Sequence, residues 1–226
     1  MNNKYLLKQF RSPRGCLSYI ISDPSSKESL LIDPSQEVET KDYLNHLKEN
    51  DLNLKYIIDT HTHADHISTS EEIKAETGAK IAMHKNSPTK RKDIELTDGD
   101  VLELGELKIN IIHTPGHTNE SICIHIDDLL FTGDTLLIDG TGRTDFQLGD
   151  SEGLYASIWE KLMKLDESTK VYPAHDYQGR SFTTLKEEKE NNPRLKLSHD
   201  EFVKMMNELH PPKPDLFEEA IEKNSK

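Results

Sequence analysis

The positions of histidine and acidic residues relative to short apolar runs limit the folds open to this chain. The segment Thr60-His61-Thr62-His63-Ala64-Asp65-His66 directly follows the β-branched run Leu54–Ile58. Three later strand-like runs are each followed by a single histidine or acidic residue: His117 follows Lys108–Ile112, Asp134 follows Leu129–Phe131 and His175 follows Lys170–Tyr172. Because the end of a strand is an edge of its sheet, one rim of a sheet can gather all of these groups. The pattern predicts a sheet edge rich in imidazoles and carboxylates.

Other short apolar runs predict further strands, with helical segments between them. The expected strands are Cys16–Ile21, Ser29–Ile32, Lys80–Met83, Val101–Leu104 and Ser121–Ile126, and Asp127-Asp128 predicts a tight hairpin. Four helices are expected. The first covers Val38–Asn50, and the second begins at a capping box, Ser68/Glu71 or Thr69/Glu72, and ends at Gly78. The third surrounds the stripe Leu154, Ile158, Leu162 and Leu165, and the fourth lies between the Ser198/Glu201 capping box and Pro211-Pro212. Hairpins are too frequent for a purely parallel sheet. We expect an α/β protein with a single domain over residues 1–226.

Composition argues against several classes of function. The 28 basic and 41 acidic residues give a net charge of −13, which argues against binding nucleic acid or an anionic membrane surface. The apolar runs stop far short of the ~20 residues that a membrane helix needs, and residues 1–14 lack the apolar core of a signal peptide. Cys16 and Cys123 are too few for a disulfide framework and are expected to be buried, reduced thiols. These features predict a cytoplasmic protein.

The donor types favour a metal site over a polar surface loop. Imidazoles with carboxylates suit zinc, iron or manganese, and the absence of a nearby cysteine in the sequence argues against a structural thiolate zinc site. Taken alone, each later candidate is an ordinary turn residue, but four such sites in succession favour a metal. The other histidines are interpreted as surface residues (His46, His199, His210), as structural residues (His84, His125) or as separated from His117 by a helix break (His113).

The motif His61-x-His63-x-Asp65-His66, followed by His117, Asp134 and His175, resembles the metal motifs of the metallo-β-lactamase superfamily in order and in approximate spacing. The resemblance extends from about residue 18 to residue 175. It implies a four-layer αβ/βα sandwich, in which two mixed β-sheets are flanked by helices and the metal lies at one edge of the sheets. The helical C-terminal segment from about residue 180 is expected to pack on this domain.

Three further motifs resemble persulfide dioxygenases of the ETHE1 type within that superfamily. They are Gly142-Arg143-Thr144-Asp145-Phe146-Gln147-x-Gly149-Asp150, Pro173-Ala174-His175-Asp176-Tyr177 and Asn192-Pro193-Arg194-Leu195 with the Ser198–Met205 segment that follows it. The resemblance implies one iron(II) per chain, Fe(2+), held by His61, His117 and Asp134 as the catalytic centre. The implied reaction oxidises the sulfane sulfur of a low-molecular-weight thiol persulfide, such as glutathione persulfide, with O2 to sulfite.

The same resemblance suggests roles for the remaining candidates. His63, Asp65, His66 and His175 would hold the ligands by hydrogen bonds or form a second metal site. Arg143 and Tyr177 would bind the substrate, although each can instead belong to a structural pair. The expected partners are the small-molecule persulfide and O2, with no nucleic acid and no membrane; a separate sulfurtransferase and a homodimer are compatible with the sequence.

Two alternatives remain open from the sequence. A binuclear zinc thioester hydrolase of the glyoxalase II type (hydroxyacylglutathione hydrolase) would use two Zn(2+). Its ligands would be His61, His63 and His117 at one site, Asp65, His66 and His175 at the other, and Asp134 between them. The Arg143 motif and the chain length favour the dioxygenase. A metal-free thiol-binding module would be expected to have lost ligands, and none is missing here.

Overall fold

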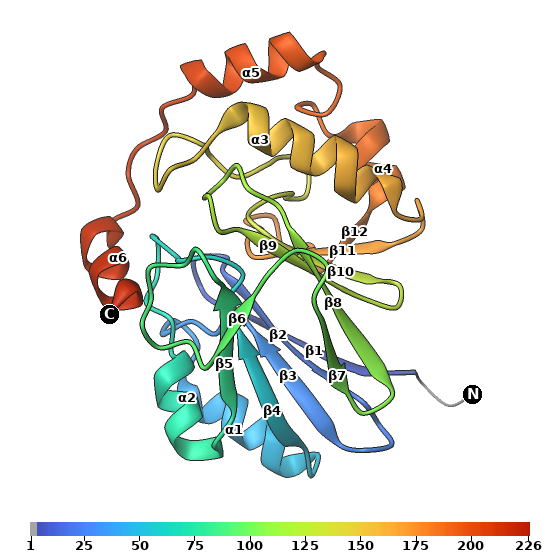
Figure 1. The fold of residues 1–226 in the computed structure, drawn as a ribbon, viewed down its shortest axis with the longest axis vertical. Coiled ribbons are helices and arrows are strands. Elements are labelled where there is room, and N and C mark those ends of the chain that lie inside the picture. The colour runs from blue at the N-terminus through green and yellow to red at the C-terminus, as the bar shows by residue number, and fades with distance from the viewer. Residues whose placement is uncertain (1–3) are drawn as a thin grey trace.

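Two six-stranded β-sheets pack face to face in the computed structural model, which describes residues 4–226 (Figure 1). The first sheet has the order β1 (Leu6–Arg11), β2 (Leu17–Ser22), β3 (Glu28–Ile32), β4 (Asn53–Ile58), β5 (Lys80–His84) and β6 (Ile94–Leu96). The second has the order β12 (Thr183–Thr184), β11 (Lys170–Pro173), β10 (Leu129–Gly133), β9 (Ile122–Ile126), β8 (Leu107–His113) and β7 (Val101–Leu104). Both sheets contain parallel and antiparallel pairs, so the expectation of two mixed sheets is confirmed.

The core between the sheets follows the two-residue period of the strands. Tyr19 and Ile21 of β2 face the second sheet, where Tyr19 contacts Phe131 of β10 at a ring-centroid distance of 5.1 Å. Ile20, between them in sequence, points to the outer face and packs with Tyr43. Strand β2 is therefore buried on both faces, which explains its continuous apolar sequence.

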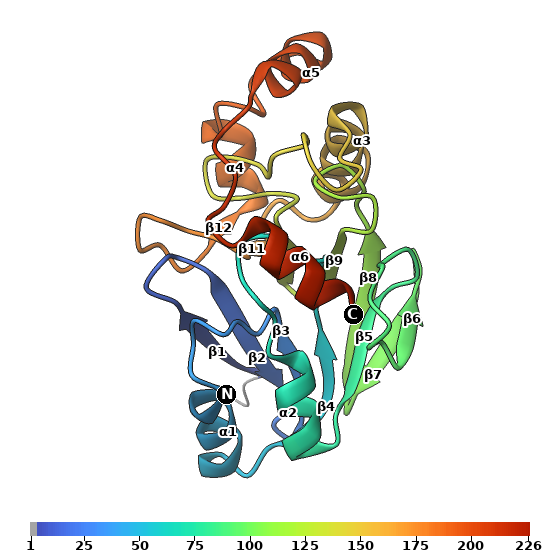
Figure 2. The ribbon, with the colours of Figure 1, turned by 90° about the vertical axis from the view of Figure 1, so that its left-hand side faces the viewer.

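Helices cover the outer faces of both sheets. The helices α1 (Thr40–Glu49) and α2 (Ser70–Thr77) lie on the first sheet. The helix α3 (Ser151–Ala156), continued by η1 (Ser157–Lys161) and η2 (Leu162–Lys164), covers the second together with α4 (Leu185–Asn191) and α5 (His199–Glu208). Three members of the predicted stripe, Leu154, Ile158 and Leu162, are fully buried there, and the fourth, Leu165, is partly buried against the same cluster. The last helix, α6 (Phe217–Ser225), follows α5 after a connecting segment and lies across the open edge between the sheets (Figure 2).

Two predicted capping boxes are wrong. Helix α2 begins at Ser70, and its N-cap residue Thr69 makes no side-chain capping bond. The Ser68 hydroxyl instead donates to the buried carboxylate of Asp59 at 2.9–3.0 Å, since a buried carboxylate needs donors more than a helix end does. The Ser198/Glu201 capping box and the Asp127-Asp128 hairpin are confirmed.

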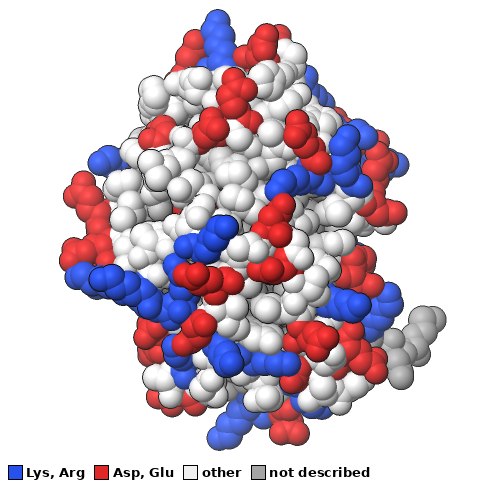
Figure 3. Space-filling view, viewed as in Figure 1, with Lys and Arg blue, Asp and Glu red and all other residues white. Residues whose placement is uncertain are grey.

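The surface agrees with the mixed charge of the sequence. On the face shown in Figure 3, acidic and basic side chains are interspersed over both sheets and the helices. Within residues 4–226, no helix combines the length and the apolar character needed to cross a membrane.

Candidate metal centre

Three donor groups meet where the ends of strands from both sheets come together. His61 follows β4 of the first sheet, whereas His117 and Asp134 follow β8 and β10 of the second. One ligand atom from each lies within 4.8 Å of the others. The two sheets are joined here, because the backbone N–H of Ile122 donates to the carbonyl of Thr60 at 2.9 Å. The rim predicted from strand ends is therefore present, and it brings this trio together.

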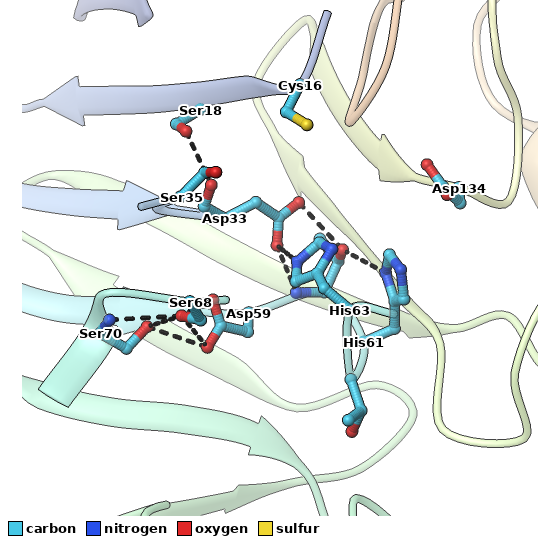
Figure 4. Close-up of polar contacts among 12 residues, drawn as sticks. Cys16, Ser18, Asp33, Ser35, Asp59, His61, His63, Ser68, Ser70 and Asp134 are labelled. Carbon is cyan, nitrogen blue, oxygen red and sulfur yellow. Dashed lines mark hydrogen bonds and ion pairs between the residues drawn. The ribbon is translucent and has the colours of Figure 1, made fainter. Parts of the chain in front are cut away.

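Hydrogen bonds orient both imidazoles of the trio. The Thr60 hydroxyl donates to Oδ2 of Asp33 at 2.9 Å and so accepts from Nδ1 of His61 at 3.0 Å (Figure 4 shows this line of contacts). Nδ1 of His117 donates to the carbonyl of Arg143 at 2.7 Å. With Nδ1 protonated in each ring, Nε2 carries the free lone pair of the neutral tautomer. Burial and the neighbouring histidines also hold the pKa of His61 well below its usual value, which keeps that ring neutral.

The carboxylate of the trio is held by His175. Nδ1 of His175 donates to Oδ1 of Asp134 at 2.7 Å, and Nε2 donates to Oδ2 of Asp65 at 2.9 Å. Burial alone would lower the pKa of His175, but the two carboxylates outweigh burial and raise this pKa well above its usual value. The pKa of Asp134 is correspondingly lowered, because His175 outweighs the effect of burial. Asp134 is therefore ionised, with Oδ2 left facing His117 at 3.6 Å from its Nε2.

Two glycines permit the close packing of the ligand loops. A Cβ atom on Gly142 would lie 2.2 Å from the carbonyl oxygen of Asp134 and 2.9 Å from Nδ1 of His117. Gly116, with φ +146°, precedes His117, and a Cβ there would lie 2.3 Å from Cα of Leu154 in α3. The backbone of these loops can approach the ligands and the helix only because both positions lack a side chain.

The ring of His63 lies beside that of His61, at a centroid distance of 4.1 Å, but its Nε2 is directed to Asp33 and not to the trio. Its Nε2 is 3.1 Å from Oδ1 of Asp33, and it forms a separate buried group with Asp33 and Asp59 (Figure 4). Burial lowers the pKa of His63 to about 3, so the ring is neutral. Its Nδ1 is buried and has no hydrogen-bond partner among residues 4–226.

The remaining candidates form a third group with a cysteine. Ligand atoms of Cys16, Asp65, His66 and His175 lie within 4.8 Å of one another. Nδ1 of His66 is 3.1 Å from Oδ2 of Asp65, whose charge overcomes the effect of burial and raises the pKa of His66 to about 10. Cys16 is buried and free, as predicted, and its Sγ lies 3.4 Å from Asp65 Oδ2.

The two predicted substrate-binding residues line a cavity of about 370 Å³ beside the trio. Arg143 already has a carboxylate partner: its Nε and Nη2 donate to Asp145 at 2.6 and 2.8 Å, and its Nη atoms also donate to the carbonyls of Pro211 and Pro212. Tyr177 is 77 % exposed and stacks on His175 at a centroid distance of 6.0 Å. The structure thus contains the acidic partner that a structural role for Arg143 requires, and its role in substrate binding stays a prediction.

The sequence interpretation missed residues that support the site. Asp33 follows strand β3 just as His61 follows β4, so the same rule about strand ends could have found it. Asn224 carries no such signal. From α6, its Nδ2 donates to the carbonyls of His63 and His66 at 2.9 Å each, and its Oδ1 accepts from the backbone N–H of Ser68 at 3.0 Å. Helix α6 therefore fixes the backbone of the histidine-rich loop.

Comparison with known proteins gives concordant matches. A model of the metallo-β-lactamase superfamily matches residues 11–93 and 86–175. The mitochondrial persulfide dioxygenase ETHE1 of Bos taurus is 39% identical over 97% of this chain and 87% of its own length. A hydroxyacylglutathione hydrolase of Pelagibacter ubique is 32% identical over 92% of this chain and 80% of its own length. The crystal structure of ETHE1 from Myxococcus xanthus has a TM-score of 0.94 and 37% identity, and covers 97% of this chain and 98% of that one.

Proposed function

Because the chain belongs to the metallo-β-lactamase superfamily, we propose that its metal centre serves an iron(II)-dependent persulfide dioxygenase of the ETHE1 type. The substrate is the persulfide of a low-molecular-weight thiol, such as glutathione. The overall reaction is RSSH + O2 + H2O → RSH + SO3²⁻ + 2 H⁺, in which the sulfane sulfur is oxidised and O2 is reduced. The observation that carries this proposal is the trio of two imidazoles and one carboxylate.

The donor set fits iron(II). Each member of the trio has its outer atom engaged by hydrogen bonding and its inner atom free, namely Nε2 of His61, Nε2 of His117 and Oδ2 of Asp134. Two neutral imidazoles and one carboxylate leave coordination positions open for substrate and O2, which is typical of non-haem iron(II) oxygenases. When bound, the iron would supply the binding and activation of O2.

The protein residues around the trio would control charge and orientation. His175 holds one proton at each ring nitrogen, which keeps Asp134 ionised and fixes the direction of its carboxylate. The Asp33–Thr60 pair fixes the ring of His61 in the same manner.

The geometry favours this proposal over a binuclear zinc hydrolase. A first zinc site would need His63 together with His61 and His117, whereas His63 groups with Asp33 and Asp59. The identity to the hydroxyacylglutathione hydrolase is also lower than that to ETHE1.

Metal content and product analysis test the proposal. Protein purified without oxygen should contain close to one iron per chain, consume O2 with glutathione persulfide and release sulfite. His61→Ala should lose both iron and activity, whereas the exposed control His210→Ala should keep both. Two zinc ions per chain with hydrolysis of a glutathione thioester and no O2 uptake would refute it.

The cellular setting is a separate proposal. We expect a cytoplasmic protein that receives persulfide from a separate sulfurtransferase, although the Bos taurus relative is named as mitochondrial. Fractionation of the source cells, with the protein detected by antibody, checks the compartment.

A further inference from the structure

The C-terminal strap, residues 209–226, contacts a ligand loop of the first sheet at its far end. Nδ2 of Asn224 in α6 donates to the carbonyls of His63 and His66 at 2.9 Å each. These two residues belong to the same loop as the metal-ligand candidate His61. Because Asn224 is buried, its amide replaces water at both carbonyls. This end of the strap therefore holds the loop that carries His61.

The near end of the strap contacts a ligand loop of the second sheet. Nη1 of Arg143 donates to the carbonyl of Pro212 at 2.8 Å, and Nη2 donates to that of Pro211 at 2.7 Å. The main-chain carbonyl of Arg143 accepts from Nδ1 of His117 at 2.7 Å. One residue thus holds the strap with its side chain and a metal-ligand imidazole with its main chain.

The strap has little apolar packing of its own. Residues 209–216 form neither helix nor strand, and the buried residues of α6 are Ala220 and Asn224. Its aromatic anchor is Phe217, whose ring centroid lies 4.5 Å from that of Phe146. A segment with few buried apolar contacts has low local stability and opens more readily than the core. Docking of the strap should therefore depend on how well its two anchoring loops are placed.

The loops that the strap joins are also the loops that a metal would join. His61 lies on one of them and His117 on the other, and with Asp134 they form the trio. A metal held by the trio would fix the position of one loop relative to the other, and a strap docked across the edge between the sheets fixes the same arrangement (Figure 2). Two binding events that require one arrangement favour each other, and the effect is reciprocal.

We propose that the C-terminal strap is a metal-responsive clamp, whose equilibrium shifts toward the docked form when the trio holds a metal. The inference rests on the metal trio of the proposed function and not on the reaction. The strap also supplies an apolar wall of the cavity beside the trio, through Leu209, Pro211, Pro214 and Phe217. Metal binding would therefore complete the cavity, so that the metal binds before the thiol carrier.

Hydrogen exchange tests the clamp without measuring activity. The backbone amides of α6 are compared between metal-free protein and protein loaded with iron(II) in the absence of oxygen. Helix α1 is the internal control, because it packs on the outer face of the first sheet. We expect exchange in α6 to slow about tenfold on loading, which is a typical size of coupling between two sites, and exchange in α1 to change little. Equal exchange of α6 in both forms, or equal slowing in α1, would overturn the proposal.

A variant at the near end shows whether the two ends act together. Arg143 contacts the strap at Pro211 and Pro212, outside α6. Arg143→Ala should nevertheless remove most of the iron-dependent slowing in α6, because the strap then spans one loop only. A purely local role of Arg143 would leave that slowing intact, and this result would contradict the clamp.

Iron affinity supplies the reciprocal measurement. Asn224→Ala should raise the Kd for iron(II) about tenfold in a competition titration with a chelator, because the effect of metal on strap and of strap on metal must be equal. Glu222→Ala changes an exposed side chain of the same helix and should bind iron like the wild type. An unchanged Kd in folded Asn224→Ala would refute the coupling, and if that variant does not fold, exchange in the wild type still decides.

The clamp and the proposed function can fail separately. A trio that takes zinc instead of iron would fail the dioxygenase proposal, but exchange in zinc-loaded and metal-free protein would still test the strap. Iron binding and sulfite production without any change in α6 would leave the dioxygenase in place and eliminate the clamp.

Discussion

Replacing Gly142 by alanine should damage the metal centre without touching a ligand side chain. The added Cβ would lie 2.2 Å from the carbonyl oxygen of Asp134, where ordinary contact begins at 3.4 Å, so the loops must separate by about 3.4 − 2.2 = 1.2 Å. The Gly142 N–H donates to that same oxygen at 2.8 Å, and the separation would break this bond. Overpacking costs about 1–3 kcal/mol and a lost hydrogen bond about 1 kcal/mol, so we expect a loss of about 2–4 kcal/mol in the free energy of unfolding.

The assay compares Gly142→Ala with Gly140→Ala in the same loop. The nearest atom to a Cβ on Gly140 would be Cβ of Leu137, at 4.0 Å, so this control should stay within about 0.5 kcal/mol of the wild type. For a chain of this size, Tm should fall by roughly 5–15 °C in Gly142→Ala. Iron bound after anaerobic loading should fall as well, since the Cβ also presses on His117. Wild-type Tm and iron content in Gly142→Ala would refute the steric argument.

Further expectations concern groups around the site. Asn224→Ala should cost about 1–3 kcal/mol in unfolding free energy, because two buried carbonyls lose their donor, whereas the exposed Glu222→Ala on the same helix should be near neutral in urea denaturation. Asp33→Ala should weaken iron binding about ten- to a hundredfold, because the Thr60 hydroxyl loses its acceptor and no longer orients the ring of His61. A competition titration with a chelator measures the affinity, and an unchanged value would contradict this role of Asp33. Burial raises the pKa of Glu188 above 4.5, so its contribution to stability is present below pH 4.5 and is lost as the pH rises through the raised pKa. The stability of Glu188→Gln relative to the wild type should therefore increase as the pH rises through that pKa. A difference between the urea-denaturation midpoints of the two proteins that stays constant from pH 4 to 8 would disprove this.

Sequence patterns predicted the features that depend on local periodicity. Strand ends located His61, His117 and Asp134, since a period of two identifies a strand and the residue after it lies at a sheet edge. The same logic placed no constraint on which candidates would meet. His63 turns to Asp33, which is 30 residues away, and the loop carbonyls of His63 and His66 are held by Asn224, about 160 residues away. Such contacts depend on how the sheets and α6 dock, which short-range sequence patterns do not determine.

The origin of the three donors in two different sheets gives a bound metal the character of a cross-link. His61 is 56 residues before His117 and 73 before Asp134, so coordination would close long loops and stabilise the native chain by mass action. In the unfolded chain the local cluster of His61, His63, Asp65 and His66 could chelate an ion without His117 or Asp134. During refolding, this early, incorrect chelate would thus compete with the native trio for free metal. Loading after the sheets have docked should give the higher yield of correctly metallated protein.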